Sequence, residues 1–127
     1  MYRISVEQHF DAAHYLRGYG GKCEALHGHR FRVAARVTAS ELDDTGLAYD
    51  FTLLKEHLGK VLADYDHACL NEIAPFDEIN PSSENIAETV FRRMETKLAG
   101  AGAPVALASV EVWESPESSA TYSPDGE

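Results

Sequence analysis

Two segments in the first third of the chain alternate between hydrophobic and polar residues. The alternation is loose over residues 2–10, where Ile4 and Val6 are hydrophobic, and it is regular from His29 to Ala39. In the second segment one face carries four apolar residues, namely Phe31, Val33, Ala35 and Val37. A period of two residues is typical of a β-strand with one buried face. We predict two antiparallel strands, followed by a turn at Asp43–Gly46.

A helical segment follows this turn. Asp50 or Thr52 can cap it, because each side chain offers an oxygen to the first free backbone N–H groups. Its apolar residues recur at helical spacing: Leu54, Leu58, Val61, Leu62 and Tyr65. This spacing predicts an α-helix with one hydrophobic stripe.

A second helical segment begins after Pro81 and ends at Gly100. Ser82 or Ser83 can supply the N-cap oxygen, and Glu84 lies in the first turn, where the helix dipole favours a negative charge. The hydrophobic stripe of this segment consists of Ile86, Val90, Phe91, Met94 and Leu98. We predict a second α-helix here.

Residues 105–122 return to the alternation of a strand, and Ser115-Pro116 provides a turn within them. The order of elements is therefore strand–strand–helix–helix–strand–strand. This order predicts an α+β fold, in which two helices cover one face of an antiparallel four-stranded sheet. A length of 127 residues, of which 44% are hydrophobic, predicts a single globular domain spanning residues 1–127.

The charge and cysteine content narrow the classes of function. The chain has 21 acidic and 11 basic residues and a net charge of −10, which disfavours binding to nucleic acid. No apolar run approaches the roughly 20 residues that span a bilayer, and residues 1–7 lack the apolar core of a signal peptide. Two cysteines are too few for a disulfide scaffold. We expect a cytoplasmic protein that does not bind membranes.

The histidines provide the first candidate chemistry. His27 and His29 are two positions apart, so at the edge of a strand both imidazoles share one face. His14, in the loop expected after the first strand, can reach the same place from an antiparallel partner. Three neutral imidazoles form an open zinc site, with the fourth position left for water or substrate. The alternative is that His27 and His29 are simply polar strand residues.

Three further positions offer reactive groups. Cys23 follows Lys22, a setting that lowers a thiol pKa, although most isolated cysteines are small buried hydrophobic residues. Asp66 precedes His67 and can orient its ring for proton transfer, although a histidine is also favourable at a helix C-terminus. Glu114 ends an otherwise apolar strand, where a carboxylate is usually only a solvated charge.

These residues lie in motifs that closely resemble the 6-pyruvoyl-tetrahydropterin synthase and 6-carboxy-5,6,7,8-tetrahydropterin synthase family. The motifs are Phe10–His14, Lys22-Cys23, His27–His29, Asp50–Lys55, Asp66–Asn71, Pro81–Asn85 and Val112–Ser115. They follow in order over nearly the whole chain. The resemblance implies the tunnelling fold (T-fold) and a homo-oligomer, either a trimer or a dimer of trimers that forms a hexamer.

The resemblance also implies a role for each candidate residue. It implies Zn²⁺ as the cofactor, with three histidine ligands: His14, His27 and His29. It implies a catalytic thiol and a proton-transfer pair that is supplied across a subunit interface: Cys23, Asp66 and His67. It implies that Glu114 anchors the pterin ring, and that Ser83 and Glu84 contact the same ring.

The reaction implied by the resemblance is a lyase reaction on 7,8-dihydroneopterin triphosphate. The products are 6-carboxy-5,6,7,8-tetrahydropterin, acetaldehyde and triphosphate in queuosine biosynthesis, or 6-pyruvoyl-tetrahydropterin in the animal-type enzymes. Two other classes fit the same histidines, a non-catalytic zinc-binding protein and a zinc hydrolase. The hydrolase does not account for Cys23 or Glu114.

Glu24, directly after Cys23, adds a second possible activity. The sequence Cys23-Glu24-x-x-His27-Gly28-His29 resembles a dual subgroup that retains both a thiol and a glutamate. For this subgroup the resemblance implies a catalytic Glu24 and some 6-hydroxymethyl-7,8-dihydropterin for folate biosynthesis. The alternative is that Glu24 is a solvated loop acid, which is the usual state of glutamate.

Overall fold

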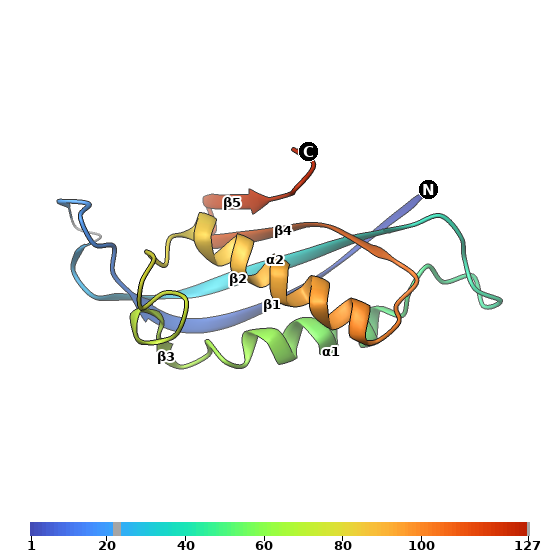
Figure 1. The fold of residues 1–127 in the computed structure, drawn as a ribbon, viewed down its shortest axis with the longest axis horizontal. Coiled ribbons are helices and arrows are strands. Elements are labelled where there is room, and N and C mark those ends of the chain that lie inside the picture. The colour runs from blue at the N-terminus through green and yellow to red at the C-terminus, as the bar shows by residue number, and fades with distance from the viewer. Residues whose placement is uncertain (22–23, 127) are drawn as a thin grey trace.

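The computed structural model describes residues 1–21 and 24–126, which form one sheet and two α-helices (Figure 1). In chain order the elements are β1 (Tyr2–His14), β2 (His27–Ala39), α1 (Phe51–Leu62), β3 (Ala68–Cys69), the 3₁₀ helix η2 (Leu70–Glu72), α2 (Ser83–Gly100), β4 (Ala106–Ser115) and β5 (Ser118–Tyr122). The α+β class and the order of the main elements are as predicted.

The sheet has five strands in the order β3-β1-β2-β4-β5. β1, β2, β4 and β5 pair antiparallel, as predicted. The prediction of a four-stranded, wholly antiparallel sheet is wrong in one respect, because the two-residue β3 adds a parallel edge next to β1. A strand of two residues is too short to show any alternation in the sequence, so its pairing could not be predicted.

The first two strands are longer than predicted, and the difference concerns the candidate site. β1 continues past Phe10 to His14, and β2 begins at His27 rather than at His29. His14 therefore lies at the end of a strand and not in a loop. The added residues include charged and histidine side chains, which break the hydrophobic alternation while backbone pairing continues.

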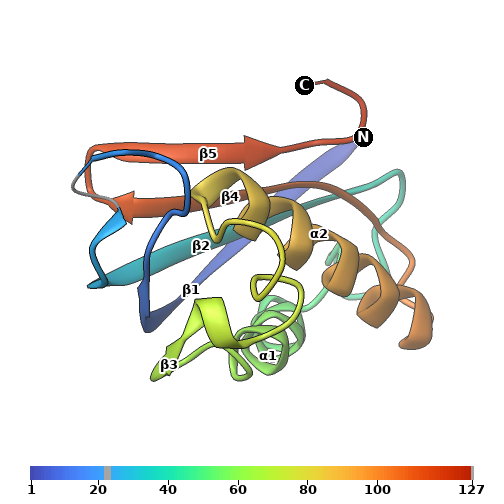
Figure 2. The ribbon, with the colours of Figure 1, turned by 60° about the vertical axis from the view of Figure 1, so that its left-hand side comes forward.

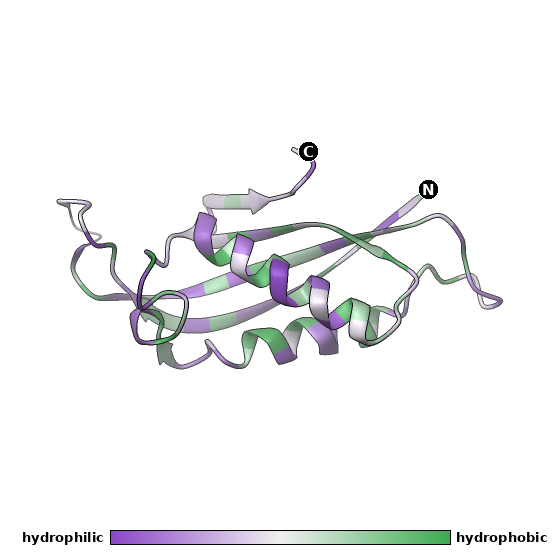
Figure 3. Ribbon diagram, viewed as in Figure 1, coloured by the Kyte–Doolittle hydropathy of each residue, from purple (hydrophilic) through white to green (hydrophobic). Residues whose placement is uncertain are grey.

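Both helices cover the same face of the sheet, as Figure 2 shows. The buried core on this face includes the predicted stripes of both helices, and it contains Phe10 and Phe31 with their rings stacked 4.9 Å apart. α1 ends at Leu62, so Tyr65 lies beyond the helix although its side chain is buried in the same core. Figure 3 shows the resulting alternation of hydrophobic and hydrophilic bands along α2.

The helix N-termini are capped by side chains. Asp50 accepts a hydrogen bond from the backbone N–H of Thr52, and Ser82 accepts one from that of Asn85. Of the alternatives left open by the sequence, Asp50 and Ser82 are the N-caps. In the described part of the chain, no helix combines the length and apolar character that crossing a membrane requires.

The face of the sheet opposite the helices carries charged pairs. Arg32 of β2 binds Glu7 of β1 at 3.1 Å, and Arg36 of β2 binds Glu111 of β4 at 2.7 Å. The guanidinium carbon of Arg32 also lies 3.6 Å from the centroid of the Trp113 ring. The two faces of the sheet therefore differ in polarity: the face under the helices forms the apolar core, and the opposite face carries a network of charged pairs.

Truncating a core leucine tests this assignment of faces. Leu58 of α1 is 0% exposed and Leu53 of the same helix is 38% exposed. We expect Leu58→Ala to lower the free energy of unfolding by about 2–5 kcal/mol, because it leaves a cavity in the core. Leu53→Ala should change it by about 0.5 kcal/mol or less. Equal losses in urea unfolding would contradict the assignment.

Candidate active site

Three histidines lie together where the pairing of β1 with β2 ends. The register places His14 opposite His27 and Ala12 opposite His29. The ring centroids of His14 and His27 are 4.6 Å apart, those of His27 and His29 are 4.8 Å apart, and those of His14 and His29 are 5.2 Å apart. Alternate residues share a face, so His29 lies on the helix-covered face with the buried Phe31.

Glu114 joins this cluster from the neighbouring strand. It lies near the end of β4, two residues after Val112, which is fully buried on the same face. Its Oε1 atom is 3.0 Å from Nε2 of His14 and 3.5 Å from Nε2 of His29. The cluster, defined as His14, His27, His29 and Glu114, has one donor atom from each residue within 4.8 Å of the others.

Hydrogen bonds to backbone carbonyls orient two of the rings. Nδ1 of His14 lies 2.7 Å from the carbonyl oxygen of Pro81, and Nδ1 of His27 lies 2.6 Å from that of Ala25. A carbonyl oxygen only accepts hydrogen bonds, so each Nδ1 carries the proton. In the neutral rings, Nε2 is then the atom with the free lone pair.

The Nε2 atoms of His14 and His29 are buried and make no hydrogen bond to any residue that the structure describes. Both are within ion-pair distance of Glu114, but the geometry of these approaches is not that of a hydrogen bond. A neutral His14 whose Nδ1 holds the proton would direct a lone pair at a carboxylate oxygen. Such an arrangement is unfavourable unless a cation lies between the two atoms.

The donor set fits a zinc ion. Burial, followed by the neighbouring His14 and His27, lowers the pKa of His29, and Glu114 opposes this by raising it. A lowered pKa keeps the imidazole neutral, which is the form that binds a metal. Three imidazole nitrogens are a ligand set that Zn²⁺ commonly uses, and the Glu114 carboxylate adds a negative charge beside them. The cluster is therefore a candidate zinc centre.

The predicted pair of Asp66 and His67 occupies a different place, at the β1–β3 edge. Oδ2 of Asp66 is 3.0 Å from Nδ1 of His67, and Oδ1 of Asp66 accepts a hydrogen bond from the backbone N–H of Asp11 at 3.0 Å. This backbone bond is the main cause that holds the pKa of Asp66 below its ordinary value, and His67 adds to it. Asp66 is thus ionised and oriented toward the imidazole.

The side chain of His67 points into solvent. Its side chain is 79% exposed, and its backbone has a φ of 57°, in the left-handed region. Its backbone N–H donates to the carbonyl of Asp11 at 2.6 Å, which fixes this unusual conformation. In the described part of one chain, no hydrogen bond or ion pair joins Asp66 or His67 to the zinc cluster. The pair is available to a group outside this chain.

The other predicted residues are only partly located by the structure. Ser83 begins α2, two residues after the carbonyl that binds His14, and Glu84 is exposed in its first turn. Glu24 is exposed, and its Oε1 atom accepts a hydrogen bond from the backbone N–H of Gly18 at 3.0 Å. Cys23 lies outside the described residues.

Sequence analysis missed the groups that orient the histidines and the acid–histidine pair. They are the carbonyls of Pro81 and Ala25 and the backbone of Asp11, whose N–H binds Asp66 and whose carbonyl binds the N–H of His67. The side chain of Asp11 binds Arg30 at 3.0 Å. Asp11 and Pro81 lie within the motifs quoted for the resemblance, so a signal was present. The motifs did not predict what these residues do, because backbone groups and structural ion pairs leave no characteristic residue pattern.

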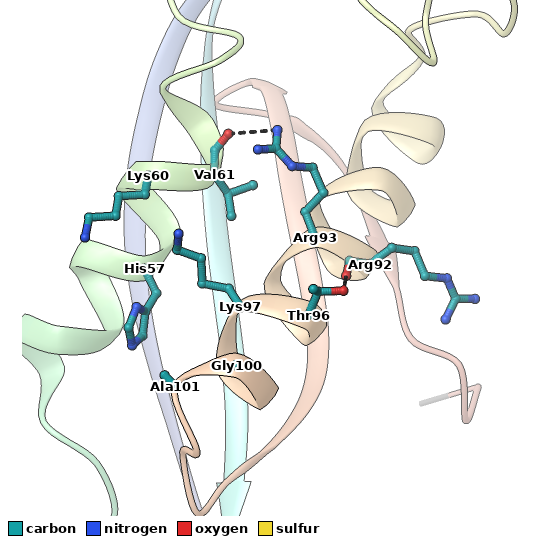
Figure 4. A pocket seen from close by; sticks show the side chains of 9 residues that line it. All are labelled: His57, Lys60, Val61, Arg92, Arg93, Thr96, Lys97, Gly100 and Ala101. Atoms are coloured by element: carbon teal, nitrogen blue, oxygen red, sulfur yellow. Dashed lines mark hydrogen bonds between the residues drawn. The ribbon is translucent and has the colours of Figure 1, made fainter.

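Two hollows differ in their relation to the cluster. One, of about 530 Å³, is lined by residues that include His29, Arg32, Trp113 and Glu114, so two members of the cluster border it. Another, of about 740 Å³, lies between α1 and α2 and contains none of the predicted site residues (Figure 4). There Arg93 donates to the carbonyl of Val61 at 3.3 Å, and neither aspartate nor glutamate is among the described residues that line the hollow. The candidate active site is therefore the first hollow.

Comparison with known proteins identifies the family. The family model described as 6-pyruvoyl tetrahydropterin synthase matches residues 3–125. A 6-carboxy-5,6,7,8-tetrahydropterin synthase from Synechocystis sp. is 39% identical over 127 residues, covering 96% of this chain and 93% of that protein. The protein of the same name from Bacillus subtilis is 30% identical over 128 residues, covering 97% of this chain and 86% of that protein.

Solved structures agree with this result. The 6-pyruvoyl tetrahydropterin synthase of Caenorhabditis elegans superposes with a TM-score of 0.79 and 27% sequence identity, covering 97% of this chain and 96% of that chain. The expected family and the expected T-fold are both confirmed. On the match over residues 3–125 and the 39% identity to a relative, this chain belongs to the 6-pyruvoyl tetrahydropterin synthase family.

Proposed function

We propose that this protein is a zinc-dependent lyase that converts 7,8-dihydroneopterin triphosphate and one water molecule into 6-carboxy-5,6,7,8-tetrahydropterin, acetaldehyde and triphosphate. The observation that carries the proposal is the convergence of His14, His27, His29 and Glu114, whose donor atoms all lie within 4.8 Å of one another. Two relatives that are 39% and 30% identical over most of this chain are named 6-carboxy-5,6,7,8-tetrahydropterin synthase. The product would enter queuosine biosynthesis in the cytoplasm.

His14, His27 and His29 would hold the zinc ion through their Nε2 atoms. When bound, zinc supplies Lewis-acid polarisation of the hydroxyl oxygens on the substrate side chain. The carbonyls of Pro81 and Ala25 support this role, because they hold the protons on Nδ1 and fix the ring directions. The lone pairs on Nε2 of His14 and His27 are thus oriented before any ligand binds.

Proton transfer is assigned to Cys23, Asp66 and His67. The Cys23 thiolate would remove a proton from the substrate side chain, and the Asp66–His67 pair would take up or return a proton near neutral pH. Asp66 supports this by its ionised state and its contact with Nδ1 of His67 at 3.0 Å. Elimination of triphosphate then follows loss of the side-chain proton.

A homo-oligomer would complete the site. His67 is exposed at the sheet edge formed by β3, while the opposite edge is formed by β5. Unpaired sheet edges are normally covered or paired, and pairing the edges of neighbouring chains would bring the Asp66–His67 pair of one chain to the cluster of another. We assign a trimer or a dimer of trimers to the active enzyme.

The pterin ring is assigned to Glu114, Ser83 and Glu84. A carboxylate can accept two parallel hydrogen bonds from the N–H groups of the ring's amino-pyrimidine edge. Glu114 is 34% exposed and lines the 530 Å³ hollow, so its carboxylate is accessible to a ligand. Ser83 and Glu84 begin α2, directly after the segment that holds His14.

Formation of 6-pyruvoyl-tetrahydropterin is the second candidate reaction. It is supported by the similarity to the Caenorhabditis elegans 6-pyruvoyl tetrahydropterin synthase. Both reactions need the same zinc centre, thiol and proton-transfer pair, so the geometry serves either one. The sequence identity of 39% to the Synechocystis protein makes the carboxy product our primary assignment.

Product analysis tests the proposed reaction. Incubation of the purified protein with 7,8-dihydroneopterin triphosphate should yield 6-carboxy-5,6,7,8-tetrahydropterin and acetaldehyde, identified by mass spectrometry. Cys23→Ala should lower kcat by about 10²–10⁴-fold with zinc retained, because only proton transfer is removed. Cys69→Ala is the matched control and should turn over normally. Wild-type turnover in Cys23→Ala would show that another group is the base.

Replacement of Glu114 separates ring binding from metal binding. We expect Glu114→Ala to weaken pterin binding by about 10-fold or more, since the ring loses a charged acceptor, while the zinc content stays near one per chain. Equilibrium binding of a non-reactive pterin and metal analysis report the two quantities separately. If zinc is lost from Glu114→Ala as completely as from His29→Ala, Glu114 is a metal ligand and not a ring anchor.

Glu24 decides whether there is a second product. We propose that its carboxylate directs some substrate to 6-hydroxymethyl-7,8-dihydropterin for folate biosynthesis. Glu24→Gln can still accept the hydrogen bond from Gly18 but lacks the carboxylate. It should therefore abolish the hydroxymethyl product and spare the carboxy product. An unchanged product mixture in Glu24→Gln would limit Glu24 to holding the loop.

A further inference from the structure

The chain beyond the end of β1 is held by a side chain rather than by a strand. Pairing of β1 with β2 ends at His14, the residue before Tyr15. The backbone N–H of Tyr15 donates to Oδ1 of Asn71 at 3.0 Å, and Nδ2 of Asn71 donates back to the carbonyl of Tyr15 at 3.0 Å. Asn71 is buried, with 5% of its surface exposed. Its amide thus replaces the missing strand partner, because it offers one acceptor and one donor.

A second asparagine repeats this arrangement two residues later. The backbone N–H of Arg17 donates to Oδ1 of Asn80 at 2.8 Å, and Nδ2 of Asn80 donates to the carbonyl of Arg17 at 2.9 Å. Asn85 of α2 donates from Nδ2 to the carbonyl of Asn80 at 2.8 Å. Asn80 is therefore fixed to the strand extension on one side and to α2 on the other.

The guanidinium of Arg17 also binds the segment that contains Asn71 and Asn80. It donates to the carbonyl of Phe76 at 2.8 Å and to the carbonyl of Ile79 at 3.3 Å. The segment from Asn71 to Asn80 is thus attached to residues 15–17 by both side-chain amides and by the guanidinium. Without these bonds, partly buried backbone groups of Tyr15 and Arg17 would lose their protein partners, which is costly.

These contacts end directly at the zinc cluster. Asn80 precedes Pro81, whose carbonyl accepts the Nδ1–H of His14 at 2.7 Å. His14 in turn precedes Tyr15, the first residue that Asn71 binds. Both partners of the His14–Pro81 hydrogen bond therefore adjoin residues that an asparagine amide holds. None of the functions assigned above uses Asn71 or Asn80.

We infer that Asn71 and Asn80 are positioning residues that control metal affinity by holding the Pro81 carbonyl against His14. The inference rests on the proposed zinc centre. If the carbonyl shifts, the proton of His14 is no longer fixed on Nδ1, and Nε2 no longer presents its lone pair to the cluster. Partners that orient a metal-binding histidine in this way typically contribute about 10–100-fold to metal affinity.

Zinc affinity of the intact, assembled protein tests the inference. Competition with a chromophoric chelator should give zinc dissociation constants about 10–100-fold higher for Asn80→Ala and Asn71→Ala than for the unchanged protein. Asn80→Asp keeps the size of the side chain and the acceptor for Arg17 N–H but loses the donor, so it should weaken zinc in the same direction. Asp77→Ala, an exposed change in the same segment, is the control and should leave the constant unchanged.

Two further measurements separate positioning from a general loss of structure. In the His14→Ala background, Asn80→Ala should cause no further loss of the weak zinc affinity that remains, measured at high zinc concentration, because its effect passes through His14. Nitrogen-15 NMR of the metal-free protein should show the His14 proton on Nδ1 in the unchanged chain and a shift toward Nε2 in Asn80→Asp. Unchanged zinc affinity and an unchanged proton position in Asn80→Asp would overturn the inference while leaving the proposed function intact. An unchanged protein that binds no zinc would overturn both.

Discussion

The antiparallel register of β1 and β2 is the constraint on which the candidate site depends. It places His14 opposite His27 and brings His29 to the same face, so that one pair of strands supplies three imidazoles. A slip of one residue would turn one strand's histidines to the opposite face. The buried stack of Phe10 on Phe31 stabilises this register, because the same slip would move one of these rings out of the core.

The candidate functional groups lie at two different places on the sheet, the helix-covered face and the β3 edge. Under the helices, the buried Nε2 atoms of His14 and His29 lie next to a carboxylate and have no hydrogen-bond partner within residues 1–21 and 24–126, which favours a cation. At the β3 edge, Asp66 and His67 remain accessible to solvent and to another chain. An acidic chain can in this way hold a positively charged centre for an anionic substrate, since a bound metal reverses the local field.

Much of the fold was predictable because its elements follow simple periods. The hydrophobic stripes of α1 and α2 and the alternation in β2 and β4 each predicted a buried face that the structure contains. β3 could not be predicted, because its two residues pair through backbone groups alone. For the same reason the sequence placed His14 in a loop, whereas strand pairing carries it to the end of β1.

The candidate site was predictable in its residue types but not in its supporting contacts. The spacing of His27 and His29 predicted a shared face, and the expected antiparallel partner strand added His14. Asp66, His67 and Glu114 were candidates from their local chemistry, and the motif resemblance gave each of them a role. Neither could predict that the carbonyls of Pro81 and Ala25 fix the tautomers, because any residue supplies a carbonyl. The closeness of Glu114 to the histidines depends on the pairing of β4 with β2, which is a long-range property of the sheet.

Metal content is the most direct test of the central claim, which is that the strand register creates a zinc centre. The purified protein should carry about one zinc ion per chain, bound through histidine nitrogens in its X-ray absorption spectrum. His29→Ala should lose the metal, whereas His9→Ala, an exposed histidine on the same pair of strands, should retain it. Equal zinc contents in these two variants, or a fully active metal-free protein, would contradict the account.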